Sequence, residues 1–327
     1  MLRLRGWTSA GLAFCLFAGA ATGGRGPDER RICWRGSWAS SQQIPEDRNA
    51  LPDEALDDAT LRQIVRTTIG GEQVRIRISN LFGTEPLRVG SVRVALSADP
   101  GSARTVPESD RAVSFGGRAS IVLPAGAEYL SDPVDLPVRP MTHLAVSLHL
   151  PEAPACQTSH PGSRATSYHV PGDRSAAPDL PGAASVAHWY QLAAVDVATD
   201  CAAAAVVTLG DSITDGFGVT PDSDTRWPDF LARRLQADPA TRHVAVLNHG
   251  IGGNRLLRDD LDPNALARFD RDVLMQMGVR AAIVLIGDND LGTASRDGLT
   301  GPEAHRALVE DMIGAYGQMV ARGRERG

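Results

Sequence analysis

The sequence predicts two kinds of structure in succession: a β-sandwich-like N-terminal domain, followed by an α/β domain built on a parallel sheet. In several segments between residues 34 and 198, apolar and polar residues alternate with a period of two, which is typical of half-buried strands. From residue 202 onward, uninterrupted apolar runs alternate with segments of helical periodicity, as in βαβ units. A chain of 327 residues is long enough for about two domains.

The first predicted domain, residues 30–200, has the pattern of many short strands. Apolar residues alternate with polar ones at 74–78 and again at 144–150, and Gly70-Gly71 and Gly116-Gly117 are typical turn signals between such strands. Frequent turns between short alternating strands favour an antiparallel sandwich. Residues 151–185 are rich in Pro, Ser, Ala and Gly, so we expect an irregular excursion there.

The second predicted domain, residues 202–327, contains three continuous apolar runs, each followed by a helical pattern. Trp227-Pro228 opens the first helix, since proline is tolerated in a first turn. A second helix carries Leu266 and Phe269, and Thr300 with Glu303 resembles a capping box at the start of the third. The expected parallel strands are 205–209, 244–247 and 281–286.

The first residues are typical of an export signal. Arg3 and Arg5 precede the short apolar run 12–17, and small residues at 18–20 would suit cleavage. We therefore expect residues 1–20 to be a signal peptide; a buried first helix is the alternative. The mature chain would then be secreted or periplasmic, with no membrane span.

Composition excludes several function classes. The chain carries a net charge of −6, whereas a protein that binds nucleic acid is expected to present a basic face. All 33 basic residues are arginine, so chemistry that needs a lysine, such as a Schiff base or a P-loop, is excluded.

The cysteines do not suggest a metal site. None of the four lies in a C-x-x-C pair, and no histidine completes a zinc pattern, so we expect neither metal nor cofactor. Export permits disulfides, and we expect Cys156 to pair with Cys201, with three free thiols in the mature chain as the alternative. The carboxylates of Asp259, Asp260 and Asp262 lack the pattern of a calcium loop, so we expect a solvated loop there.

Polar or glycine-rich clusters follow each of the three predicted parallel strands. In an open α/β sheet, ligands bind beyond the carboxyl ends of the strands, so these clusters are expected to meet at one edge. A serine, a glycine with a free N–H and an asparagine amide are the groups that a serine nucleophile and its oxyanion hole need. The clusters are 210–216, 248–254 and 287–290.

Three motifs in these clusters resemble the first blocks of the SGNH (GDSL) esterase/acylhydrolase superfamily: Gly210-Asp211-Ser212, Asn248-x-Gly250-Ile-x-Gly253-Asn254 and Gly287-x-Asn289-Asp290. The resemblance runs from about 205 to 323 and implies a three-layer, flavodoxin-like α/β domain. More loosely, residues 75–84 and Trp189-Tyr190 resemble the β-rich domain that precedes the hydrolase in some exported bacterial members.

The resemblance also implies roles for individual residues. Ser212 would be the nucleophile, and the N–H groups of Ser212 and Gly253 and the amide of Asn289 would bind the oxyanion. Asp211 and Asn254 would support the loops.

The chain departs from the family pattern at the general base. The family uses a histidine with an aspartate three residues earlier, and none of the eight histidines here has that neighbour. Three β/α units are also fewer than the about five strands of the family's sheet. We therefore expect a C-terminally truncated hydrolase domain with the base outside this chain. A histidine from the β-rich part, such as His169 or His188, is the alternative base, and His249 is expected to be structural.

The sequence thus predicts a serine ester hydrolase that acts on small acyl esters, with acetylated carbohydrate as the preferred substrate class. The missing base leaves a second hypothesis: an exported carbohydrate-binding or scaffold protein whose hydrolase domain is inactive.

Overall fold

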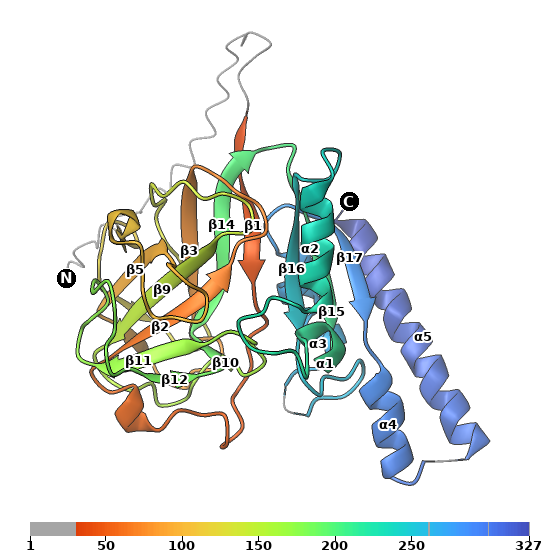
Figure 1. Ribbon diagram of the computed structural model, residues 1–327. Helices are drawn as coiled ribbons and strands as arrows, with labels where there is room; N and C mark the ends of the chain where they lie inside the picture. Colours follow the sequence, from red (N-terminus) through yellow and green to blue (C-terminus); the bar gives the residue numbers. More distant parts are fainter. Residues whose placement is uncertain (1–30, 261, 300, 327) are drawn as a thin grey trace, which may run out of the picture. The chain divides into compact units, whose positions relative to one another are not determined.

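The computed structural model describes residues 31–260, 262–299 and 301–326, and the chain from Ile32 onward forms one compact unit (Figure 1). The predicted signal peptide, residues 1–20, lies outside the described residues. Within them, no helix has the length and apolar character needed to cross a bilayer.

Two antiparallel sheets dominate the first part of the chain. The four-stranded sheet has the order β1-β14-β3-β8, with β1 (Ile32–Ala39), β14 (Leu192–Asp200), β3 (Gln73–Ser79) and β8 (Glu128–Leu130). The six-stranded sheet has the order β12-β11-β2-β9-β5-β6, with β12 (Ala184–Val186), β11 (Ser167–Pro171), β2 (Ala59–Arg66), β9 (His143–Leu150), β5 (Ser91–Leu96) and β6 (Arg111–Val113). Shorter elements are β4 (Leu87–Val89) with β7 (Ile121–Leu123), β10 (Ser159–His160) with β13 (Trp189–Tyr190), and the 3-10 turns η1 (Asp53–Ala55) and η2 (Pro107–Ser109).

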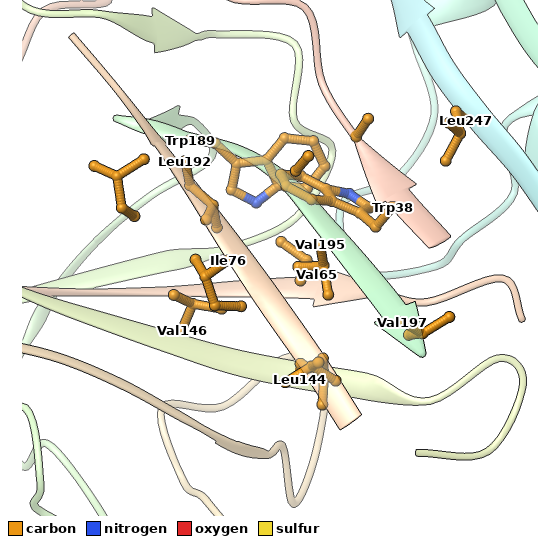
Figure 2. Close-up of a cluster of buried hydrophobic side chains, with 14 of the residues drawn as sticks. Trp38, Val65, Ile76, Leu144, Val146, Trp189, Leu192, Val195, Val197 and Leu247 are labelled. Atoms are coloured by element: carbon orange, nitrogen blue, oxygen red, sulfur yellow. The ribbon is translucent and has the colours of Figure 1, made fainter. Parts of the chain in front are cut away.

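The alternating pattern of these strands places one apolar set in a shared core. Ile76 of β3, Val146 of β9 and Val195 of β14 are fully or almost fully buried in the same cluster (Figure 2). Trp38 and Trp189 meet edge to face in that cluster, with ring centroids 4.8 Å apart. The β-rich character predicted for this part of the chain is confirmed, and the apolar side chains of its two large sheets pack into one core.

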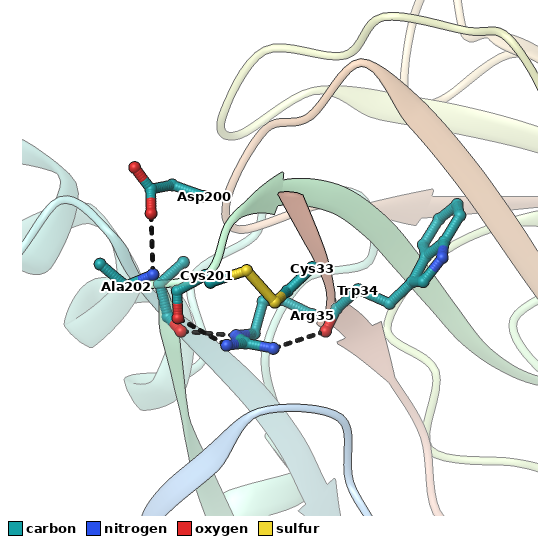
Figure 3. Close-up of a disulfide and its surroundings, with 7 residues drawn as sticks. Cys33, Trp34, Arg35, Asp200, Cys201 and Ala202 are labelled. Carbon is teal, nitrogen blue, oxygen red and sulfur yellow. Dashed lines mark hydrogen bonds between the residues drawn. A yellow bond between two sulfur atoms is a disulfide. The ribbon is translucent and has the colours of Figure 1, made fainter. Parts of the chain in front are cut away.

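The disulfide differs from the predicted one. Cys33 pairs with Cys201, and Cys156 is a half-buried free thiol (Figure 3). The expected Cys156–Cys201 bridge is therefore wrong. The reason is sheet pairing: Cys33 lies opposite Thr199 in the antiparallel β1–β14 ladder, so residues 168 positions apart become neighbours.

The second part of the chain forms a three-stranded parallel sheet of order β16-β15-β17. Helix α2 packs on β16, and the continuous helix α3–η3 lies next to β15 and β17. The strands are β15 (Ala204–Gly210), β16 (Val244–Gly250) and β17 (Val279–Leu285). The helices are α1 (Ser212–Asp215), α2 (Trp227–Ala237), α3 (Ala265–Phe269), the π-helical η3 (Asp270–Leu274), α4 (Asp288–Arg296) and α5 (Pro302–Glu325).

Strand β1 packs against the parallel sheet at a glycine. A Cβ on Gly36 would lie 2.9 Å from a methyl group of Leu247 in β16, which is too close for a side chain. The N–H of Gly36 also donates to the carbonyl oxygen of Met277, 2.9 Å away, just before β17. The sheets of the two parts of the chain therefore adjoin through β1.

Strand β17 is an edge strand in the described part of the chain. Ile283 and Leu285 on it are 41% and 44% exposed, whereas the central strand β15 is largely buried. An edge strand of an open parallel sheet has a neighbouring strand on one side only, so its apolar side chains are less covered.

Candidate active site

One cavity of about 430 Å³ brings together the predicted nucleophile and both other predicted oxyanion residues: Ser212, Gly253 and Asn289. This size lies in the usual range for small-molecule sites. The walls come from both parts of the chain. Residues Asp215, Phe217 and Gly252 complete the α/β side, and Gln43, Glu46, Arg48, Asn49, Pro161, Gly162, Arg164 and His188 form the side from the β-rich part.

The parallel sheet explains why these motifs converge. Gly210 of β15 lies in register with Gly250 of β16 on one side and with Leu285 of β17 on the other. Because all three strands are parallel, their carboxyl ends lie along one edge. The predicted placement of the three motifs at that edge is therefore observed.

The serine lies at the first position of α1, which is capped by Asp211. The Asp211 carboxylate accepts a hydrogen bond from the N–H of Ile213 at 3.0 Å, and its burial raises the pKa of that carboxyl. A Cβ on Gly210 would lie 2.2 Å from Oγ1 of Thr214, so only glycine fits before this turn. Ser212 itself is partly exposed to the cavity.

Three donors on the cavity wall are available to a ligand. The N–H groups of Ser212 and Gly253 make no hydrogen bond within the described residues. The side-chain amide of Asn289 donates to the carbonyl oxygen of Asn254 at 2.9 Å. An amide nitrogen carries two N–H groups, so one remains after this contact fixes the side chain. This arrangement could bind a developing oxyanion.

Arg268, which the sequence analysis missed, holds the loops behind these donors. Its side chain is fully buried, and it donates to the carbonyl oxygens of Gly210 and His249 and to Oδ1 of Asn254, over 2.9–3.1 Å. It also forms an ion pair with Asp272 at 2.9 Å. Its i,i+4 spacing to Asp272 on a predicted helix was the available signal.

The β-rich part is fixed to α1 by a buried pair. Nε2 of His160 lies 3.0 Å from Oδ1 of Asp215, and both side chains are 3% exposed. A Cβ on Gly162 would lie 1.8 Å from Oδ2 of Asp215, so the backbone of this segment rests directly on that carboxylate. The role of His160 has no signal in the sequence, because nothing local connects it with residue 215.

The histidines near the site differ in what they could do. Nδ1 of His188 lies 2.6 Å from the carbonyl oxygen of Pro161, so Nδ1 carries the proton and Nε2 keeps its lone pair in the neutral ring. Burial lowers the pKa of His188, which favours that neutral form. His169 lies in β11 and does not line the cavity. Among the described residues, no histidine hydrogen-bonds to the hydroxyl of Ser212.

His249 is buried behind the cavity, 2% exposed, with Nδ1 3.0 Å from the hydroxyl of Ser41. Burial lowers the pKa of His249 to about 4, so the ring is neutral at neutral pH.

The loop 259–262 was expected to be solvated. Asp259 and Asp260 are exposed, but Asp262 is only 6% exposed, so the expectation is wrong for that residue. No group of His, Cys, Asp and Glu within the described residues is arranged to hold a metal ion.

A known protein family matches the second part of the chain. Residues 208–327 match the GDSL-like Lipase/Acylhydrolase family. This part of the chain is a GDSL-like lipase/acylhydrolase domain. The matched GDSL domain includes Ser212, Gly253 and Asn289, and the wall from the β-rich part lies outside it.

Solved structures are similar to the chain only at low identity. A family two carbohydrate esterase from Cellvibrio japonicus is 14% identical, with a TM-score of 0.24, over 91% of this chain and 83% of that one. An acetyl xylan esterase from Butyrivibrio proteoclasticus is 12% identical, with a TM-score of 0.30, over 92% and 76%. Another crystal structure is 22% identical, with a TM-score of 0.24. The match covers 33% of this chain and spans only 56% of the length of that one. No curated protein gives a sequence match.

Proposed function

We propose that the chain is a serine ester hydrolase in which Ser212 forms an acyl-enzyme. The observation that carries the proposal is the cavity that Ser212, Gly253 and Asn289 of the GDSL domain line together. Asp211 and Asn254 would support the loops that present these groups, since both are buried and hydrogen-bonded to them.

In this reaction, Oγ of Ser212 attacks the carbonyl carbon of the ester and transfers its proton to a base. The carbonyl oxygen becomes negative and is bound by the N–H groups of Ser212, Gly253 and Asn289. The C–O bond to the alcohol then breaks, and the alcohol leaves with a proton. Water attacks the acyl-serine in the same geometry, and the carboxylic acid leaves. Loss of one oxyanion donor costs about 3–4 kcal/mol of barrier in such sites.

We propose small acyl esters as substrates, with acetylated carbohydrate preferred, and a secreted or periplasmic location. Polar walls support the substrate class: the side from the β-rich part presents amides and arginines instead of an apolar acyl channel. The disulfide fits an oxidising compartment.

Hydrolysis of p-nitrophenyl acetate by the chain, beside Ser212→Ala, tests the proposal. We expect release of p-nitrophenol by the wild type and its loss in the variant. Ser223→Ala is the matched control, since Ser223 is exposed and does not line the cavity. Equal rates in all three proteins would contradict an acyl-enzyme on Ser212.

A second candidate is a carbohydrate-binding protein with an inactive hydrolase domain. It is favoured by the absence of a histidine bonded to Ser212 among the described residues, although such bonds can be loose without substrate. The variant His188→Gln tests whether His188 of the β-rich part is the general base. If the wild type turns over and this variant does not, the β-rich part supplies the base; turnover unchanged in the variant places the base elsewhere.

A further inference from the structure

Arg164 is a cation of the cavity wall that has no counterion in the described part of the protein. The other charged groups there are paired: Glu46 with Arg48 at 2.8 Å, and Asp215 with His160 at 3.0 Å. Arg164 makes no side-chain hydrogen bond or ion pair among the described residues, and its Nε is buried without a partner. The cavity therefore has one unneutralised positive charge on its wall.

The segment that carries Arg164 is fixed on both sides. The Asp222 carboxylate accepts hydrogen bonds from the N–H and the hydroxyl of Thr166 at 2.7 and 2.6 Å, and the N–H of Asp222 donates to the Arg164 carbonyl oxygen at 2.9 Å. Arg164 and Asp222 both have left-handed backbones, with φ of 49° and 62°. Such conformations persist only where the surroundings determine them, so the backbone that carries the Arg164 side chain is held in place before any ligand arrives.

The guanidinium and the proposed nucleophile Ser212 line the same cavity. Cζ of Arg164 is 5.8 Å from the ring centroid of Phe217, which is 78% exposed and also lines the cavity. The N–H of Phe217 in turn donates to the carbonyl oxygen of Ser212 at 2.8 Å. A group held by Arg164 would therefore belong to the same small molecule as the ester bond.

A neutral hydrogen-bonding group faces the same space. The side chain of Gln43 is 4% exposed, lines the cavity and makes no side-chain hydrogen bond within the described residues. Its amide is therefore available to a ligand hydroxyl. One free guanidinium and one free amide match a polyhydroxylated ligand with a single negative charge.

We propose that the cavity takes an ester of an acidic saccharide, whose carboxylate is bound by Arg164. The ester part of this inference rests on the proposed function. The carboxylate and the hydroxyl groups of the ligand rest on Arg164 and Gln43. A planar guanidinium binds a carboxylate through two parallel hydrogen bonds, and a single cation suits a monoanion better than a phosphate dianion.

Calorimetric binding of galacturonate, a monoanion, and of its neutral analogue galactose tests the inference without turnover. We expect the acidic ligand to bind at least about tenfold more tightly, because a charged hydrogen bond contributes that much. Arg164→Gln should lose this preference while still binding the neutral sugar, which also shows that the variant is folded. The preference of the wild type should shrink with added salt.

Arg233→Gln is the matched control, since Arg233 is also half-buried over a phenylalanine ring, 4.2 Å from the centroid of Phe230, but lies outside the cavity. It should keep the preference. Equal affinity for both sugars in the wild type, or an equal loss in the two variants, would overturn the proposal. Arg164-dependent binding without hydrolysis of any ester would instead refute the proposed reaction and leave the ligand class standing.

Discussion

His160 and Asp215 form a buried pair, 3.0 Å apart, between β10 of the β-rich part and the short helix that begins with Ser212. Nδ1 of the same ring lies 2.8 Å from the carbonyl oxygen of Ser41, so His160 connects three segments that are distant in sequence. This pair joins the β-rich part to α1, which also packs on β15 and β16.

Breaking this pair should destabilise the whole protein. We expect His160→Gln to lower the free energy of unfolding by about 3–5 kcal/mol, because Asp215 would remain buried without its partner. Urea unfolding measures the change. His149→Gln is the control: His149 meets Asp58 at the same 3.0 Å, but Asp58 is 72% exposed, and such pairs contribute about 0–1 kcal/mol. Equal effects of the two variants would contradict a special role for the buried pair.

Substitution of Arg268 should also destabilise the folded protein. Its removal takes one donor from Asp272 and one from each of the carbonyl oxygens of Gly210 and His249, while Arg271 and Ser41 remain partners of Asp272. We expect Arg268→Met to reduce stability by at least about 3 kcal/mol in urea unfolding. Arg234→Met, on the exposed side of α2, should change it by less than about 0.5 kcal/mol. A mild effect of Arg268→Met would mean that the loops hold their positions without it.

The disulfide should contribute strongly because it closes a long loop. Cys33 and Cys201 are 168 residues apart, and a disulfide that closes so long a loop stabilises the folded state by about 3–5 kcal/mol. We expect the double variant Cys33→Ser/Cys201→Ser to have a clearly lower thermal midpoint. Cys156→Ser should leave the midpoint nearly unchanged, since Cys156 is a free thiol. The reverse result would restore the bridge first expected from the sequence.

Asp262 should make stability fall with rising pH. Burial raises the pKa of its carboxyl from 3.8 to about 8, and both oxygens lack a hydrogen-bond partner among the described residues. Between these two pH values the folded state holds a proton that the unfolded state has released, so folding is progressively disfavoured as pH rises.

Asp262→Asn should therefore flatten the pH dependence and raise stability at pH values above about 8. Urea unfolding at several pH values between about 4 and 9 measures it. Asp260→Asn, at an exposed position, should keep the wild-type slope. An unchanged slope in Asp262→Asn would show that another group causes it.

Asn289 should matter for turnover but not for folding. Its amide is fixed by the carbonyl oxygen of Asn254, and the remaining N–H faces the cavity in our mechanism. We expect Asn289→Ala to lower kcat for p-nitrophenyl acetate by about 10²–10³-fold. Asp288→Asn, at the exposed neighbouring position, should keep the wild-type kcat. A purely raised KM in Asn289→Ala would point to substrate binding instead of oxyanion stabilisation.

The sequence alone determined the local structure and the GDSL motifs. Alternation at 74–78 specified strand β3, and the apolar runs near 205, 244 and 281 specified the parallel strands, because period and burial are properties of neighbouring residues. The edge where Ser212, Gly253 and Asn289 meet followed from strand direction. The division into a sandwich-like domain at 30–200 and a hydrolase domain at 202–327 stays a prediction.

Only the tertiary structure decided which distant residues meet. The Cys33–Cys201 bridge follows from the pairing of β1 with β14, and the contacts of His160 with Asp215 and of Arg268 with Asn254 follow from packing across segments. The wall that carries Arg164 likewise depends on where an irregular segment rests on α1. Side-chain contacts between remote segments leave no periodic trace in the chain, so the sequence pointed to Ser212 as the proposed nucleophile but not to the residues of the opposite cavity wall.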